Sequence, residues 1–326
     1  MLQIFLVTIP FFALVAAGYV AARSRVLPLE AIPGLNAFVL YFALPCMLYR
    51  FGASTPIAQL LDGSVALVWG VCALATVGAV VALSRNERIG WNDASFGALV
   101  AAFPNTGFMG VPLLTAILGA QAVGPVIIGI TFDMVLTTSL CIALSRLDAA
   151  GSHGAAQAMR KALAGVLRNP MPWAILLGAV ASAAGYGLPG PVERTGAMLG
   201  DPASPVALFT TGAVLARSAM LAREARGQAP LADVLPVVLV KLIAHPLLVL
   251  AAALAARAMG MPLGLPTCAA LVLMAALPSA SNVSMLAERF GADNGRIARI
   301  ILWTTVAAFF SFPLVVGWTE HLRRAA

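Results

Sequence analysis

The chain has 326 residues, of which 61% are hydrophobic and 10% charged, and its formal net charge is +7 at pH 7. The mean hydropathy of +0.94 lies far above that of soluble proteins, which excludes a water-soluble globular domain. Nucleic-acid binding would need basic residues gathered on one face with aromatic residues between them, but here Lys and Arg stand in loops between apolar segments. We therefore expect an all-α integral membrane protein.

Apolar runs of about 20 residues, the length of a membrane-spanning helix, recur along the chain. The first is expected to be a retained helix and not a signal peptide, because its first positive residue, Arg23, follows the apolar run. Between polar breaks, the runs predict ten spans, at 2–22, 33–50, 64–83, 95–118, 123–145, 169–188, 203–221, 232–256, 266–288 and 297–318.

Basic residues in the loops indicate the orientation of these spans. Connections after odd-numbered spans hold 14 Lys and Arg, even-numbered connections and the C-terminal tail hold 5, and Lys241 lies inside a span. Because cytoplasmic loops are enriched in Lys and Arg, both termini are predicted to be periplasmic in an inner-membrane protein. The longest connection, 148–167, then becomes a cytoplasmic linker between a first five-helix repeat at 1–147 and a second at 168–326. Five spans per half would give the second repeat an inverted topology.

Two spans in corresponding places carry a proline followed by small polar residues. The fourth reads GALVAAFPNTGFMGVPLLTAILGA, the ninth reads CAALVLMAALPSASNVSMLAERFGA, and Pro104 aligns with Pro278. A proline breaks the helical hydrogen-bond ladder, and the freed backbone groups need partners inside a membrane. Paired broken helices also point two partially positive N-termini at the gap between them, which favours an anion. The alternative is that proline and small polar residues only serve helix packing.

Three runs in the same order resemble the auxin efflux carrier family of transporters. They are NAFVLYFALPCMLYRF at 36–51, FPNTGFMGVPLL at 103–114 and LPSASNVSMLAERFGAD at 277–293. The resemblance covers essentially the whole chain. It implies two inverted five-helix repeats whose fourth and ninth helices cross near Pro104 and Pro278, and a homodimer that moves organic acids such as malonate or auxin.

The resemblance also implies a division of labour among the helices. Spans 1, 2, 6 and 7 would form a scaffold, and spans 3–5 and 8–10 a core that moves as an elevator. Asn105 and Asn282 would contact the substrate, although Ser279, and not Asn282, stands opposite Asn105 in a strict repeat. With their neighbours, the expected substrate contacts at the crossing are Asn105, Thr106, Gly107, Ser279, Ser281 and Asn282.

Ionisable residues inside spans are costly and are candidates for function. Asp133 lies in the fifth span, while Lys241 and His245 lie in the eighth at i and i+4, on one face of a helix. Lys241 and His245 are expected to meet a substrate carboxylate, and Asp133 to carry a coupling proton or to pair with Lys241. Two structural alternatives remain, in which Asp133 and Lys241 only hold helices together and His245 only satisfies a carbonyl freed by Pro246.

These features predict a secondary transporter of small organic anions. The alternative, from another class, is a membrane receptor that binds a ligand without moving it. We expect no enzyme, because HExxH, GxSxG and paired catalytic Asp residues are missing from the spans. No cofactor or metal is expected either, since the four Cys residues form no CxxC pair and have no His beside them. A single acidic residue within the spans favours proton coupling, or none, over sodium.

Overall fold

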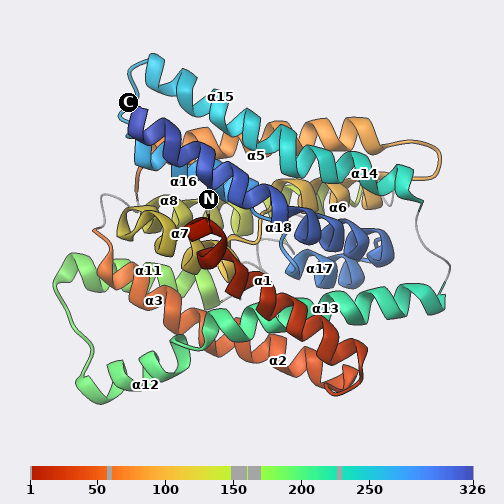
Figure 1. Cartoon of the computed structure of the whole chain (residues 1–326), viewed down its shortest axis with the longest axis horizontal. Coiled ribbons are helices and arrows are strands. Elements are labelled where there is room, and N and C mark those ends of the chain that lie inside the picture. The colour runs from red at the N-terminus through yellow and green to blue at the C-terminus, as the bar shows by residue number, and fades with distance from the viewer. Residues whose placement is uncertain (1, 57–60, 148–159, 161–169, 226–229, 326) are drawn as a thin grey trace.

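The computed structural model describes residues 2–56, 61–147, 160, 170–225 and 230–325, and every regular element within them is a helix. Most helices run along the longest axis of the molecule (Figure 1). The first half contains α1 (Leu2–Arg23), α2 (Ile32–Phe38), α3 (Leu44–Ser54), α5 (Gly63–Ser84), α6 (Trp91–Ala102), α7 (Val111–Leu118), α8 (Val123–Phe132) and α9 (Thr138–Leu144). The second contains α11 (Pro170–Ala184), α12 (Gly190–Gly200), α13 (Ala203–Ala225), α14 (Leu231–Leu239), α15 (His245–Ala258), α16 (Leu265–Ala276), α17 (Asn282–Phe290) and α18 (Asn294–Ala325).

Six helical segments of the described chain are long and apolar enough to cross a membrane. They are Leu6–Arg23, Leu29–Ser54, Gly63–Ser84, Ala120–Leu144, Leu231–Ala258 and Asn294–His321. Each corresponds to a predicted span, and no end differs by more than four residues. The other four predicted spans correspond to the interrupted pairs α6–α7 and α16–α17, to the short α11 and to α13, so a total of ten spans stays a prediction. Apart from residue 160, the predicted linker 148–167 lies outside the described residues.

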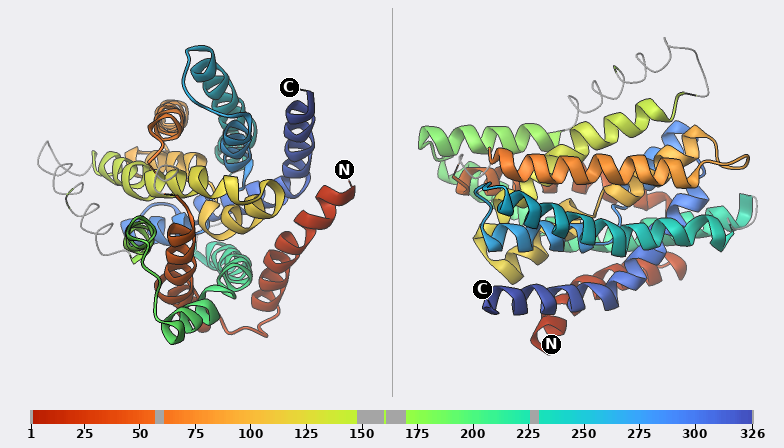
Figure 2. Two further views of the ribbon diagram at one scale, coloured as in Figure 1. Left: turned by 90° about the vertical axis from the view of Figure 1, so that its left-hand side faces the viewer. Right: turned by 90° about the horizontal axis from the view of Figure 1, so that it is seen from above.

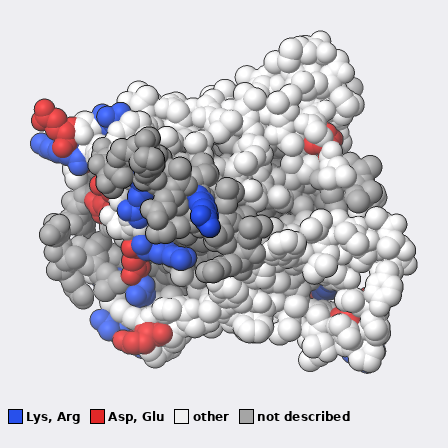
Figure 3. All heavy atoms as spheres, turned by 180° about the vertical axis from the view of Figure 1, so that it is seen from behind, with Lys and Arg blue, Asp and Glu red and all other residues white. Residues whose placement is uncertain are grey.

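The outer surface of the bundle is apolar. On α18, Trp303, Val306, Phe310 and Leu314 follow one face and are 46%, 48%, 62% and 58% exposed. A water-soluble protein does not present such a stripe, whereas lipid solvates it without cost. On the face that Figure 3 shows, the charged residues that are drawn lie toward the two ends, most of them at the end where α5 finishes and α6 and α14 begin. The chain is therefore a multi-pass membrane protein.

Four short π-helical turns interrupt the spans, and three of them precede a proline. Leu44, Val111 and His245 each donate the backbone N–H to the carbonyl five residues back, and each is followed directly by a proline. Because a proline ring collides with the preceding turn and has no N–H to donate, a wider turn relieves the strain. These turns are η2 (Val39–Ala43), η3 (Thr106–Gly110) and η6 (Val240–Ala244), and the fourth is η5 (Asp133–Thr137).

The helices form two groups. Helices α1, α2, α3, α11, α12 and α13 lie on one side, and α5, α14, α15, α16 and α18 on the other, as Figure 1 and the left view of Figure 2 show. Within the first group, glycines bring backbones into direct contact: a Cβ atom on Gly18 of α1 would lie 1.8 Å from the carbonyl oxygen of Phe209 on α13. A Cβ on Gly178 of α11 would likewise lie 2.3 Å from the carbonyl oxygen of Tyr49 on α3. Close packing over small residues is the usual way in which membrane helices associate.

Candidate functional site

The two broken helices meet at their breaks. Helix α6 ends at Ala102 and helix α16 at Ala276, and the extended residues that follow pair as an antiparallel bridge between Pro104 and Ser279. The Asn105 N–H donates to the Pro278 carbonyl at 2.8 Å, and the Ala280 N–H donates to the Phe103 carbonyl at 3.0 Å. Each break thus satisfies backbone groups that the other break has freed, which an apolar environment requires.

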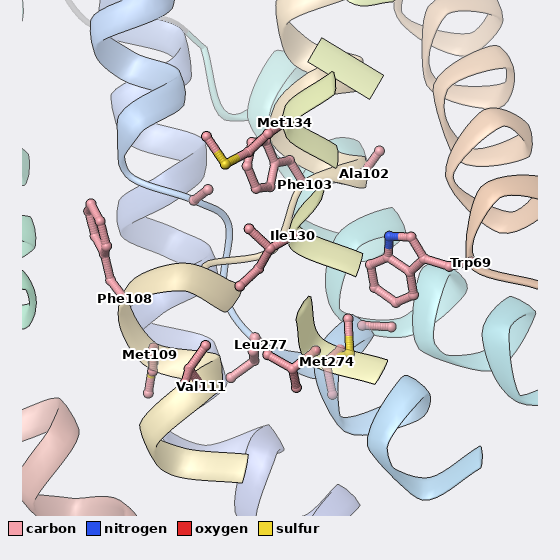
Figure 4. Close-up of a cluster of buried hydrophobic side chains, with 14 of the residues drawn as sticks. Trp69, Ala102, Phe103, Phe108, Met109, Val111, Ile130, Met134, Met274 and Leu277 are labelled. Atoms are coloured by element: carbon pink, nitrogen blue, oxygen red, sulfur yellow. The ribbon is translucent and has the colours of Figure 1, made fainter. Parts of the chain in front are cut away.

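A narrow pocket lies beside this crossing. Its lining residues are Phe103, Pro104, Asn105, Gly107, Phe108, Ile130, Met134, Met171, Ala280 and Asn282, and its empty volume, counted out to its open mouth, is about 320 Å³. Phe103, Ile130 and Met134 lie together in the close-up of the buried apolar side chains, with Phe108 on the η3 turn (Figure 4). The wall therefore comes from both breaks, from the α8–η5 segment and from α11.

Polar groups in the pocket are few. Asn105 is 5% exposed, and the Asn282 carbonyl oxygen Oδ1 is buried without a hydrogen-bond partner among the described residues. The η3 turn begins at Thr106 and α17 begins at Asn282, so two helical N-termini adjoin the pocket. The helix dipole gives each end about half a positive charge. The arrangement can hold a small anion by amide groups and partial charges.

Three predicted contacts at the crossing, Thr106, Ser279 and Ser281, are not among the residues that line the pocket. The Thr106 hydroxyl donates a long bond, 3.4 Å, to the Pro104 carbonyl. The Ser281 hydroxyl pairs with that of Thr211 on α13 at 3.1 Å. The Ser279 hydroxyl is buried and has no hydrogen-bond partner in the part of the chain that the structure describes, while its N–H donates to the Thr304 hydroxyl of α18 at 3.3 Å. Of the predicted crossing residues, Pro104, Asn105, Gly107 and Asn282 line the pocket.

The predicted charged residues form a separate buried cluster behind the crossing. Asp133, Lys241 and His245 are 0%, 0% and 1% exposed, and none of them lines the pocket. Lys241 Nζ donates to the Ala275 carbonyl at 2.9 Å and lies 3.4 Å from His245 Nδ1. The Thr137 hydroxyl donates to Asp133 at 3.0 Å, and no ion pair joins Asp133 to Lys241. Lys241 therefore has a backbone partner that the sequence did not indicate. Its expected contact with a substrate carboxylate stays a prediction.

Apolar lining residues escaped prediction. Ile130, Met134 and Met171 carry no signal in a sequence that is apolar throughout its spans, so only the fold could single them out. The hydroxyl partners Thr211 and Thr304 do leave a trace, because each belongs to a Thr-Thr pair inside an apolar span.

Known proteins with similar sequences are transporters. A family model described as "Membrane transport protein" matches residues 4–316. A "Putative malonate transporter" of Rhizobium meliloti (strain 1021) is 29% identical over 98% of this chain and 95% of that protein. An "Uncharacterized transporter" of Methanothermobacter thermautotrophicus is 26% identical over 92% of this chain and 93% of its own length. The "Uncharacterized transporter YfdV" of Escherichia coli (strain K12) is 25% identical over 64% and 67%.

The matched region takes in all three motifs that resemble auxin efflux carriers, since it runs from residue 4 to residue 316. The resemblance drawn from these motifs is thereby confirmed. The chain belongs to the membrane transport protein family, the family of the auxin efflux carriers, and it is a membrane transporter.

Proposed function

We propose that this transporter is a secondary transporter that moves a small organic anion, a carboxylate such as malonate, by elevator-type alternating access. The observation that carries the proposal is the pocket at the crossing, where two half-helix N-termini and the side chains of Asn105 and Asn282 meet. Discontinuous helices that point their N-termini at a mid-membrane site are a recurring way of binding anionic substrates in transporters.

The chemistry of the pocket suits a short carboxylate. Apolar walls surround two amide side chains, which suits a substrate with a small carbon skeleton and polar ends. The name of the relative from Rhizobium meliloti, which mentions malonate, supports this class of substrate.

Helix contacts support two inverted repeats. If the first span corresponds to the sixth and the second to the seventh, the contact of α1 with α13 is the counterpart of the contact of α11 with α3. Both contacts are close and depend on reciprocal glycines: Gly18 and Gly212 in the first, Gly52 and Gly178 in the second. The two breaks, which also exchange places under this operation, pair with each other.

The same contacts support a scaffold of spans 1, 2, 6 and 7 and a moving core of spans 3–5 and 8–10. Met171 belongs to α11 of this scaffold, whereas the other lining residues of the pocket belong to the core. A substrate held by the core would thus lie against the scaffold, where sliding of one group on the other changes its access. We further propose a homodimer in the inner membrane with periplasmic termini, for which the charge-rich end of the molecule would be cytoplasmic.

Asp133 is the candidate for coupling to protons. One carboxylate oxygen accepts a hydrogen bond from Thr137, and the other is buried without a partner among the described residues. Among the described residues Asp133 forms no ion pair, and a buried carboxylate without one is costly, so uptake of a proton would stabilise it. We propose that Asp133 binds the coupling proton, while the substrate occupies the pocket at the crossing.

Counterflow in proteoliposomes tests the transport proposal. Vesicles loaded with unlabelled malonate should accumulate labelled malonate from outside, because a carrier exchanges substrate across the membrane and a receptor does not. Asn105→Ala and Asn282→Ala should each raise the malonate concentration that gives half-maximal exchange by about tenfold, the loss expected for one hydrogen bond to a charged group. Asn86→Ala, in the exposed turn after α5, is the matched control and should leave half-saturation unchanged. Saturable malonate binding without counterflow would favour the receptor.

A further inference from the structure

Lys241 is a buried cation whose hydrogen-bond partner is a backbone carbonyl at the end of a broken helix. It lies in the η6 turn, and its Nζ donates a 2.9 Å hydrogen bond to the carbonyl oxygen of Ala275. Ala275 is the last residue but one of α16, directly before the break. The ammonium group therefore sits at the C-terminus of this half-helix.

The Ala275 carbonyl needs an external donor because the break has removed its own. In a continuous helix the N–H of Ser279, four residues on, would bind it. Here the Ser279 N–H turns instead to the Thr304 hydroxyl at 3.3 Å. A helix C-terminus also carries about half a negative charge, which a cation offsets.

We infer that Lys241 is a positioning residue that fixes the end of α16 and, through it, the geometry of the crossing. Two residues beyond Ala276, the Pro278 carbonyl accepts the Asn105 N–H at 2.8 Å, so a displaced helix end would move a backbone that carries a pocket residue. His245, at 3.4 Å, helps to hold the ammonium group. The η6 turn exists because Pro246 follows, and neither Lys241 nor His245, which stand within and directly after it, lines the pocket.

Hydrogen–deuterium exchange on the full chain in nanodiscs tests this role without any substrate. In Lys241→Met, which keeps length but removes charge and donor, amides in segments 103–110 and 277–284 should exchange about tenfold faster or more. Lys241→Arg should restore slow exchange. Ile243→Met changes a lipid-facing neighbour in the same turn, 54% exposed, and should leave both segments unchanged. Lys241→Gln supplies the test if Lys241→Met does not fold.

Unchanged exchange at both segments in the folded neutral variants would overturn the inference. A second measurement, which rests on the proposed function, separates positioning from direct contact. A positioning role predicts that Lys241→Met weakens binding of malonate and of its monomethyl ester by the same factor in thermal-shift titrations. A selective loss for malonate, which has a second carboxylate, would show direct contact and overturn the inference. If the wild-type protein binds neither compound, the proposed substrate class fails, while the exchange experiment still decides the role of Lys241.

Discussion

Replacing Gly212 of α13 by alanine tests the backbone contact between α1 and α13. A Cβ atom there would lie 1.9 Å from the Val15 carbonyl oxygen and 2.7 Å from the Tyr19 backbone nitrogen. Ordinary contact begins near 3.4 Å, so the two helices must separate by about 1.5 Å (3.4 minus 1.9). Neither obstacle is a side chain that can change rotamer, and separation also loosens the reciprocal contact of Gly18. We expect a loss of about 1 to 3 kcal/mol in the free energy of unfolding, the usual range for overpacking.

Gly78→Ala on α5 is the matched control, because a Cβ at Gly78 meets nothing within 4 Å and the residue also lies inside a long helix. Alanine has the higher helix propensity, so this variant should be unchanged or more stable by up to about 1 kcal/mol. Steric trapping in bicelles measures both free energies, and thermal unfolding in one detergent gives the order of stability. Equal stability of the two variants would refute the proposed backbone contact.

Three further changes test separate parts of the molecule. Asp133→Asn should abolish malonate uptake driven by an imposed pH gradient but preserve counterflow, whereas loss of both in a folded variant would contradict a coupling role. Arg296, 3% exposed, donates to the backbone carbonyls of Asp93 and Asp233 at 2.9 and 3.1 Å. Arg296→Met should therefore lower the free energy of unfolding, measured by steric trapping, by about 3 kcal/mol. No change would show that these bonds contribute little. Met171→Trp should fill the pocket and block uptake in proteoliposomes of folded protein, and normal uptake would place the substrate elsewhere.

The broken helices were predictable because their cause is local. Pro104 and Pro278 remove a donor wherever they stand in a helix, and a polar side chain beside each proline marks the break in an apolar run. The six long spans follow for a similar reason, since length and hydropathy are properties of a continuous segment. Alignment of the two halves already matched the two breaks, 174 residues apart, and the resemblance to a transporter family added that the two helices cross there.

The surroundings of Lys241 and His245 could not be predicted in the same way. A spacing of four residues indicates a shared helix face, but the π-turn between them changes the direction in which that face points. The partner of Lys241 is moreover a backbone carbonyl, which every residue possesses and which therefore leaves no trace in a sequence. The apolar lining residues Ile130 and Met134 were hidden because they resemble the rest of their span.

Because the pocket and the charged cluster are separate, the proposed preference for an anion would arise from the pocket and not from Lys241. With Lys241 engaged at the end of α16, the polar side chains that line the pocket are the amides of Asn105 and Asn282, beside two helical N-termini. Half a charge at about 4 Å, with an effective dielectric constant of about 20, attracts a unit anion by about 2 kcal/mol before desolvation. For the anionic substrate proposed here, two such ends would favour binding over a neutral molecule, by an amount that the cost of desolvation reduces.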